Sequence, residues 1–230
     1  MEQIKKENLK IAVIYTGMPA YLVDSVESEI KKALNGRAVT FLTLSDPRII
    51  ADAVENGSPS PLAARRLYSL YHMAIAGGAD IVYNGCSSVG DIADEAKIMF
   101  KRIGVPFVRI DENMAQRAVR EYKRIGVLAT LPSTLAPTKR LVARSAQEAA
   151  RTVTIVDALA DKAFGVPLEQ QAPLLIEKAM TINDDVDCFV LAQGSMAICR
   201  AAIEEATGKP VYDSPRYGAM AIAQIAEDIK

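Results

Sequence analysis

The stretch Asp80-Ile-Val-Tyr-Asn-Gly-Cys-Ser-Ser88 decides the fold of this chain. Its first four residues predict a short buried strand, and the polar segment after them predicts a loop at the strand's carboxyl end. Helical patterns flank it on both sides, over Leu62–Ala76, which Gly77-Gly78 ends, and over Asp91–Lys101. A strand between two helices is typical of a parallel sheet that helices cover on both faces.

The same alternation extends along the whole chain. We expect strands at Ile11–Tyr15, Val39–Leu44, Asp80–Tyr83, Val105–Ile110, Ile125–Ala129, Val153–Val156, Asp187–Leu191 and Lys209–Asp213. Further helices are expected at Tyr21–Leu34, Thr134–Ala150, Leu168–Ile182, Ile198–Ala206 and Arg216–Ile229. The segment Asp46–Ser60 contains proline and glycine and is expected to be a loop with one helical turn.

The second half of the chain repeats the first. Ile11-Ala-Val aligns with Ile125-Gly-Val at an offset of 114 residues, and the strand at Asp80 aligns with the strand at Asp187 at an offset of 107. The repeat predicts an α/β protein with two pseudo-symmetric parallel-sheet α/β/α lobes of about 100 residues each. We expect the first lobe at residues 1–112 plus 214–230 and the second at 113–213. Ligands of open α/β sheets bind outside the carboxyl ends of the strands, so the expected site is the cleft between the lobes.

Composition and charge exclude several classes of function. The chain has 230 residues, with 27 Lys and Arg against 28 Asp and Glu, a net charge of −1 and no Trp. The even charge balance provides no basic surface, and a chain without Trp offers little for base stacking. We therefore expect no nucleic acid partner. No apolar run reaches the length of a membrane span, and residues 1–7 lack the apolar core of a signal peptide. We therefore expect a cytoplasmic protein with no membrane partner.

Three cysteines and one histidine leave few options for metal or disulfide chemistry. Cys86, Cys188 and Cys199 form no CxxC motif, and His72 is the only histidine. We therefore expect no metal site and no disulfide framework. The chain also lacks the glycine-rich dinucleotide and phosphate-loop motifs, so no motif supports a nucleotide site.

The loops at equivalent strand ends carry the candidate chemistry. The offset of 107 residues pairs Cys86 with Gln193 in the repeat. Each loop is expected to open a helix, where unpaired N–H groups suit a small carboxylate and the helix dipole favours the thiolate of Cys86. Hydroxyl groups that would add to such a site belong to Ser87, Ser88, Thr130, Ser133 and Ser195.

Several candidates have a purely structural alternative. Cys188 in mid-strand and Cys199 in a helix are typical of small buried residues. His72 lies inside a helix and far from any strand end, so a structural role is expected there. Thr130–Thr134 is equally consistent with a helix cap alone, because Ser and Thr are common at that position.

Four segments have the order and spacing of the motifs of a known family. They are Asn84–Ser88, Arg109–Met114, Ile125–Thr130 with Ser133-Thr134, and Leu191–Met196. Together they resemble the aspartate/glutamate racemase superfamily, which includes hydantoin racemases, maleate isomerase and arylmalonate decarboxylase. The resemblance implies two α/β lobes and activity without pyridoxal phosphate, metal or any other cofactor. Homodimers are common in the family, although no patch in this sequence fixes one.

The resemblance also assigns roles to individual residues. Racemases of the family place one cysteine from each lobe on opposite faces of the substrate, where one thiolate removes the α-proton and the other thiol returns a proton. Cys86 matches the first cysteine. Ser87 and Ser88 match residues that hold the substrate carboxylate, and Thr130 and Ser133 match a Thr-x-x-Thr carboxylate contact. The expected substrate-binding set is Asn84, Ser87, Ser88, Thr130, Ser133, Ser195 and Met196.

Gln193 stands where the second cysteine of the family should be, and an amide neither takes nor gives a proton at a useful pKa. Cys188 lies five residues before position 193, and Cys199 lies six residues after it. A single thiol cannot run symmetric two-base racemisation. It can protonate an enediolate from one face, add to an alkene, or work with a water or another side chain as the second acid. Gln193 would then donate hydrogen bonds to a carboxylate or enolate oxygen.

We therefore expect a racemase-like isomerase that acts at carbon next to a carboxylate in a small amino acid or diacid, with Cys86 and Gln193 at its catalytic centre. A one-thiol decarboxylase of a malonate-like diacid and a non-catalytic protein that binds a small acid are the alternatives.

Overall fold

The computed structural model describes residues 6–17 and 20–229, which form two compact units. The first unit contains the described residues up to Ile110 and those from Gly218 onward, and the second is Asp111–Tyr217. The chain returns to the first unit inside its last helix, α9 (Ser214–Asp228). Residues 1–5, part of the segment expected to lack a signal peptide, lie outside the described residues.

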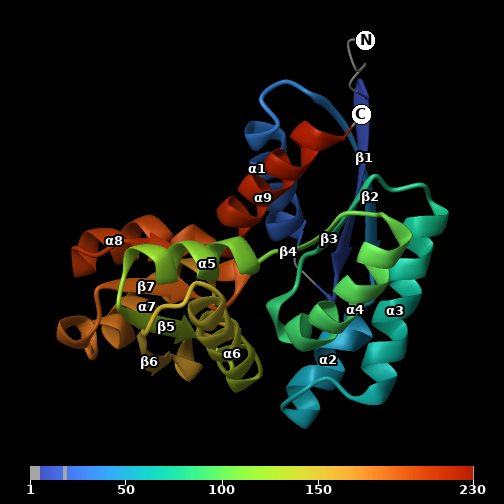
Figure 1. Ribbon diagram of the computed structural model, residues 1–230. Helices are drawn as coiled ribbons and strands as arrows, with labels where there is room; N and C mark the ends of the chain where they lie inside the picture. Colours follow the sequence, from blue (N-terminus) through green and yellow to red (C-terminus); the bar gives the residue numbers. More distant parts are fainter. Residues whose placement is uncertain (1–5, 18–19, 230) are drawn as a thin grey trace. The chain divides into compact units, whose positions relative to one another are not determined.

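The first unit is a four-stranded parallel sheet in the order β2-β1-β3-β4, with helices on both faces (Figure 1). A short 3₁₀ helix, η1, follows the central strand β3. The elements are β1 (Asn8–Tyr15), α1 (Ala20–Ala33), β2 (Ala38–Ser45), α2 (Pro47–Asn56), α3 (Pro61–Ala76), β3 (Ile81–Asn84), η1 (Ser87–Val89), α4 (Gly90–Ile103) and β4 (Phe107–Arg109).

The second unit repeats this architecture with the strand order β6-β5-β7-β8, again all parallel. Its 3₁₀ helix η4 follows β7 as η1 follows β3. The elements are α5 (Glu112–Glu121), β5 (Arg124–Ala129), α6 (Pro132–Glu148), β6 (Thr154–Leu159), η2 (Asp161–Ala163), α7 (Leu168–Met180), η3 (Asn183–Asp185), β7 (Cys188–Leu191), η4 (Gly194–Cys199), α8 (Arg200–Thr207) and β8 (Val211–Tyr212).

Each sheet is covered on both faces because its strands are apolar on both sides. In β1, Ile11 and Val13 pack with α1 and α9, whereas Ala12 and Ile14 pack with α3 and α4. This division follows from the alternation of side chains along a strand. In the second unit, α5 and α6 cover one face of the sheet, and α7 and α8 cover the other. The expected α/β class with two parallel-sheet lobes is confirmed.

Two helices differ from expectation. The segment expected to be a loop with one helical turn contains α2, a helix of ten residues. Asp46 caps it by accepting a hydrogen bond from the Arg48 N–H at 3.1 Å, and Pro47 occupies the first turn, where its missing N–H costs nothing. Helix α5 has no expected counterpart, and its buried residues include Met114, Ala115 and Ala118.

Hydrogen bonds repeat between the two units and fix which residues correspond. Asp80 accepts from the N–H of Lys10 at 2.8 Å, and Asp187 accepts from the N–H of Arg124 at 2.9 Å. Past the central strands, the Gly85 N–H donates to Ile14 at 2.8 Å and the Ala192 N–H donates to Leu128 at 2.9 Å. Cys86 and Gln193 are the next residues in each unit, so they occupy equivalent positions.

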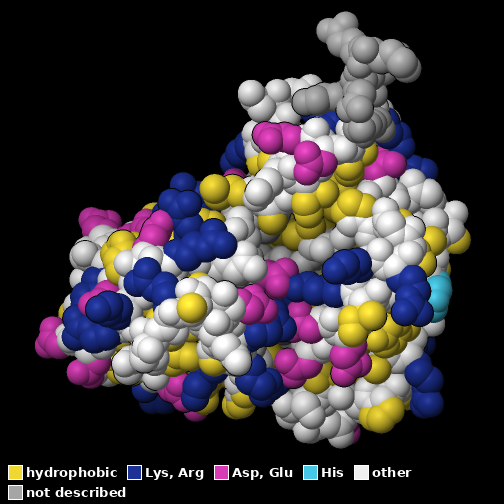
Figure 2. Space-filling model, in the orientation of Figure 1, with side chains coloured by type: hydrophobic (Ala, Val, Ile, Leu, Met, Phe, Trp, Pro, Cys, Tyr) yellow, Lys and Arg dark blue, Asp and Glu magenta, His cyan; other side chains and the backbone are white. Residues whose placement is uncertain are grey.

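The surface shows acidic and basic side chains intermixed over the face seen in Figure 2, in keeping with the net charge of −1. Among the described residues, no helix combines the length and apolar character that crossing a membrane requires.

Candidate functional site

Cys86 lies in a tight loop directly after β3. The preceding Gly85 has no room for a side chain, because a Cβ there would lie 3.1 Å from the Ile14 carbonyl oxygen and from the Tyr15 ring. Cys86 itself has extended backbone angles, φ −134° and ψ 122°, and occupies the cap position of η1. Its side chain is 4% exposed. The strand end, the glycine and the 3₁₀ helix together fix the backbone from which the Cys86 side chain projects.

The surroundings of Cys86 act on its pKa in opposite directions. Burial is the largest influence and raises the pKa of the thiol. The Thr16 hydroxyl, the N–H and hydroxyl of Ser88 and the N–H of Val89 lower it. Burial prevails, so the pKa lies above its ordinary value and Cys86 is a neutral thiol at pH 7. The expected effect of the helix dipole, which would favour the thiolate of Cys86, is therefore smaller than the effect of burial.

Asn84 is held by two hydrogen bonds inside the protein. Its Oδ1 accepts from the Tyr71 hydroxyl at 2.9 Å, and its Nδ2 donates to the Cys86 carbonyl at 2.9 Å. The residue is fully buried. The structure thus gives Asn84, which was expected to bind substrate, a role in holding the Cys86 loop.

The two serines after Cys86 differ in their surroundings. Ser88 directs its N–H and hydroxyl at the Cys86 sulfur, where both lower the pKa of the thiol. Ser87 is 5% exposed, and its hydroxyl has no hydrogen-bond partner among the described residues. A buried hydroxyl normally has a partner, so Ser87 is the serine of this loop that is suited to a ligand.

In the second unit, Gln193 is bound to Thr130. Its Oε1 accepts from the Thr130 N–H at 2.7 Å, and its Nε2 donates to Thr130 Oγ1 at 2.6 Å. Gln193 has extended backbone angles, φ −128° and ψ 135°, and caps η4 as Cys86 caps η1. Thr16, which contacts the Cys86 sulfur, is offset from Thr130 by the same 114 residues as the strands. Thr16 was not among the residues expected at the site, although the repeat places it opposite Thr130.

The remaining expected residues of the second unit fall into two groups. Ser133 lies in the first turn of α6 and is 5% exposed, and its hydroxyl has no partner among the described residues. Ser195 is half-buried in η4. Met196 differs from the expected ligand contact, because its side chain is fully buried in the core beside Leu191 and its N–H donates to the Gln193 carbonyl at 3.0 Å.

The other two cysteines lie in the core of the second unit. Cys188 is fully buried in β7, and burial raises its pKa to about 12. Cys199 is 3% exposed at the end of η4 and donates to Oε1 of Gln171 at 3.7 Å. Both are packed as small apolar side chains. His72 is exposed on α3. No group of three or more metal-ligating side chains occurs in residues 6–17 and 20–229.

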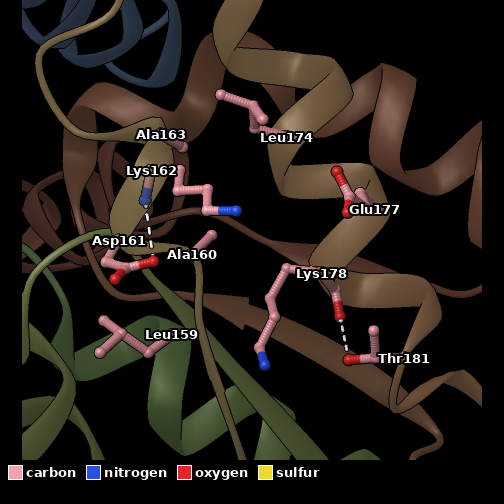
Figure 3. A pocket seen from close by; sticks show the side chains of 9 residues that line it. All are labelled: Leu159, Ala160, Asp161, Lys162, Ala163, Leu174, Glu177, Lys178 and Thr181. Carbon is pink, nitrogen blue, oxygen red and sulfur yellow. Dashed lines mark hydrogen bonds between the residues drawn. The ribbon is translucent and has the colours of Figure 1, made fainter.

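A surface pocket in the second unit lies beside the end of β6 (Figure 3). It has a volume of about 260 Å³, and Ala160 and Ala163 are the only buried residues in its lining. Its rim carries Lys162, Glu177 and Lys178. None of the residues expected at the site lines this pocket.

Solved structures with similar folds include racemases and a decarboxylase. Glutamate racemase RacE1 from Bacillus anthracis has a TM-score of 0.71 at 13% identity, covering 96% of this chain and 83% of that one. Aspartate racemase from Picrophilus torridus has a TM-score of 0.70 at 16% identity, covering 96% of both chains. A glycine-to-cysteine variant of arylmalonate decarboxylase has a TM-score of 0.53 at 15% identity, covering 95% of this chain and 94% of that one.

Curated protein sequences include no match to this chain. A family model, Asp/Glu/Hydantoin racemase, matches residues 12–222. That match contains the loop of Cys86, the Thr130–Gln193 pair and both sheets except the first four residues of β1. The chain belongs to the Asp/Glu/hydantoin racemase family.

Proposed function

We propose that this protein is a racemase-like isomerase that moves a proton at carbon next to a carboxylate in a small amino acid or diacid, with Cys86 as its single reacting thiol. The observation that carries the proposal is the equivalence of Cys86 and Gln193 in the repeat. One unit offers a thiol at this position and the other offers an amide, which is neither a usable acid nor a usable base at neutral pH.

The proton-transfer step follows from the state of Cys86. The minor thiolate form of Cys86, which the hydrogen bonds from Thr16, Ser88 and Val89 stabilise, takes the α-proton of the substrate and leaves an enediolate. The neutral thiol formed in this step then returns its proton to that carbon, or first exchanges it with solvent. A single thiol returns the proton to the face it came from, so exchange of the α-proton with solvent should outpace inversion.

In this proposal, hydroxyl groups of the second unit donate hydrogen bonds to the substrate carboxylate. Gln193 donates to Thr130 Oγ1, so the hydroxyl hydrogen of Thr130 is directed away from Gln193 and is available to an acceptor. The unpartnered hydroxyl of Ser133 is a second donor. In this arrangement Gln193 positions Thr130, whereas the sequence argument made Gln193 itself the donor to substrate.

A decarboxylase of a malonate-like diacid is the second candidate, and the raised pKa of Cys86 favours it. Loss of carbon dioxide leaves an enediolate directly, so the enzyme needs one proton donor and no base. A buried thiol that is protonated at rest supplies that proton.

The experiment that tests both candidates is incubation in D₂O with amino acids, maleate and substituted malonates. NMR would follow deuteration at the α-carbon, and chiral chromatography would follow inversion. Headspace analysis would measure the release of carbon dioxide. The proposal expects deuteration faster than inversion, and loss of both in Cys86→Ala. Cys199→Ala is the matched control, because it removes a buried thiol outside the site. Conversion by Cys86→Ala at the wild-type rate would refute the role of Cys86, and saturable ligand stabilisation without turnover would indicate a binding protein.

A further inference from the structure

The hydroxyl of Tyr71 is a buried polar group that lies behind the Cys86 loop. Tyr71 is on α3, fully buried, and its hydroxyl contacts Oδ1 of Asn84 at 2.9 Å. Asn84 then contacts the Cys86 carbonyl at 2.9 Å through Nδ2. A chain of two hydrogen bonds therefore joins a helix of the scaffold to the backbone of the reacting residue.

The direction of both bonds is fixed by chemistry. The Cys86 carbonyl can only accept, so Asn84 must present its amide nitrogen there and its amide oxygen to Tyr71. Tyr71 must therefore donate. Burial raises the pKa of Tyr71 well above its ordinary value, so the hydroxyl keeps its proton over the whole working range of pH.

Aromatic packing keeps the Tyr71 hydroxyl in place. Its ring meets Phe107 edge to face at 5.3 Å, Phe100 at 5.5 Å and Tyr68 at 5.9 Å between centroids. The main chain of Asn84 is also fixed, because its carbonyl accepts from the Ile110 N–H at 3.0 Å. The amide of Asn84 is thus held from both ends by groups that cannot shift freely.

Holding the Cys86 carbonyl also orients the amides that follow it. A peptide unit is planar, so fixing the C=O of Cys86 fixes the N–H of Ser87 on the opposite side of the same plane. The next two N–H groups, of Ser88 and Val89, lower the pKa of the Cys86 thiol. Ser88 and Val89 belong to η1, which begins at Ser87, so a shift of that peptide plane would move the start of the helix that carries these two donors.

We propose that Tyr71 is a positioning residue for Cys86, acting through Asn84 on the Cys86 carbonyl. The inference deepens the proposed function, since its activity readout rests on Cys86 being the reacting group. Its chemical readout, the reactivity of the Cys86 thiol, does not depend on the reaction or on the substrate.

The test compares Tyr71→Phe, which removes one hydroxyl and keeps the ring, with Tyr68→Phe on the same helix, which removes a hydroxyl outside the chain of hydrogen bonds. Iodoacetamide labelling of Cys86 is measured against pH by peptide mass spectrometry, which separates it from Cys188 and Cys199. In Tyr71→Phe we expect the midpoint of the labelling profile to rise by about half a pH unit, and kcat to fall about fivefold with KM unchanged. Tyr68→Phe should match the wild type.

A second variant guards against a general loss of stability. Asn84→Leu removes both hydrogen bonds of the Asn84 amide without adding charge, so it should shift the midpoint at least as far. The double variant Tyr71→Phe/Asn84→Leu should shift it no further than Asn84→Leu alone. An unchanged midpoint in Tyr71→Phe, or equal shifts in Tyr71→Phe and Tyr68→Phe, would overturn the proposal. The midpoint could shift in Tyr71→Phe while Cys86→Ala still converts substrate. That outcome would support the positioning role of Tyr71 and refute only the proposed function.

Discussion

Gln193 binds Thr130 with both ends of its amide, accepting from the Thr130 N–H at 2.7 Å and donating to Thr130 Oγ1 at 2.6 Å. The equivalent pair in the first unit is Cys86 and Thr16, where the threonine hydroxyl lowers the pKa of the thiol. The two units therefore use one threonine position in two ways. In the first unit the threonine hydroxyl lowers the pKa of a thiol, and in the second the threonine hydroxyl is fixed by an uncharged amide.

Gln193→Glu should weaken substrate binding more than it slows the chemical step. The carboxylate can still accept from the Thr130 N–H but cannot donate to Oγ1, and its charge repels a substrate carboxylate. We expect KM to rise about tenfold, with kcat within about threefold of wild type. Steady-state kinetics would check this, with Gln147→Glu, on the exposed face of α6, as the control for added charge. A fall in kcat at constant KM would contradict the assignment.

Thr130→Val removes the proposed donor while keeping the shape of the side chain. We expect a rise in KM of about tenfold, because the hydroxyl hydrogen no longer reaches the carboxylate. Gln193→Leu removes the amide without adding charge, and since Gln193 acts through Thr130, the double variant Thr130→Val/Gln193→Leu should raise KM by much less than the product of the two single effects. Fully multiplicative effects would show that Gln193 binds substrate on its own.

Gln193→Cys places a thiol at the position equivalent to Cys86. A second thiol is the feature that two-base racemases of the family have and this chain lacks, so the ratio of inversion to solvent exchange should rise by about tenfold or more. The ratio would be measured in D₂O by NMR and chiral chromatography. Gln193→Ser, which adds a hydroxyl of similar size without a usable acid, is the control and should leave the ratio unchanged.

Much of this architecture could be predicted from the sequence because apolar periodicity and repetition are local signals. The pairing of Cys86 with Gln193 came from the offset between the strands at Asp80 and Asp187, and the repeated hydrogen bonds confirm it. Helix α2 was missed because its start depends on Asp46 capping and Pro47 in the first turn, which also signal a loop.

The roles of Asn84 and Met196 could not be predicted, because both depend on which way a side chain points from a loop. Asn84 turns inward to Tyr71, thirteen residues earlier on α3. Met196 turns into the core of its own unit. The state of Cys86 was also beyond the sequence, since burial and four hydrogen-bond donors pull its pKa in opposite directions and only their three-dimensional arrangement decides the sum.

Gly90→Ala should destabilise the first unit, because Arg109 occupies the space of the new methyl group. A Cβ at Gly90 would lie 2.3 Å from Nη2 and 2.8 Å from Cζ of Arg109. The guanidinium cannot move without cost, since Nη1 donates to the Gly90 carbonyl at 2.9 Å and pairs with Asp94 in a buried site. We expect a loss of about 2–3 kcal/mol in urea unfolding. Adding Arg109→Met to Gly90→Ala tests the cause. The double variant should lose less stability than the two single losses combined, and additive losses would contradict the clash.

The stability of the protein should fall above pH 9, and Cys188 should account for part of that fall. Burial, followed by the charges of Asp187 and Glu121, raises the pKa of Cys188 from 9.0 to about 12 in the folded state. Below pH 9 the thiol is neutral in both states, so it has no effect on the pH dependence. Above pH 9 the unfolded chain releases the proton and the folded protein does not, which favours unfolding by about 1.4 kcal/mol at pH 10.

Cys188→Ala should therefore lose less free energy of unfolding than the wild type between pH 7.5 and pH 10, although its stability at pH 7.5 is lower because a buried sulfur has been removed. Urea unfolding at the two pH values would measure the difference. Val190→Ala, a fully buried residue of the same strand with no titratable group, is the matched control and should show the full wild-type pH dependence. If Cys188→Ala lost as much stability on going to pH 10 as Val190→Ala does, the buried thiol of Cys188 would not be a source of the alkaline instability.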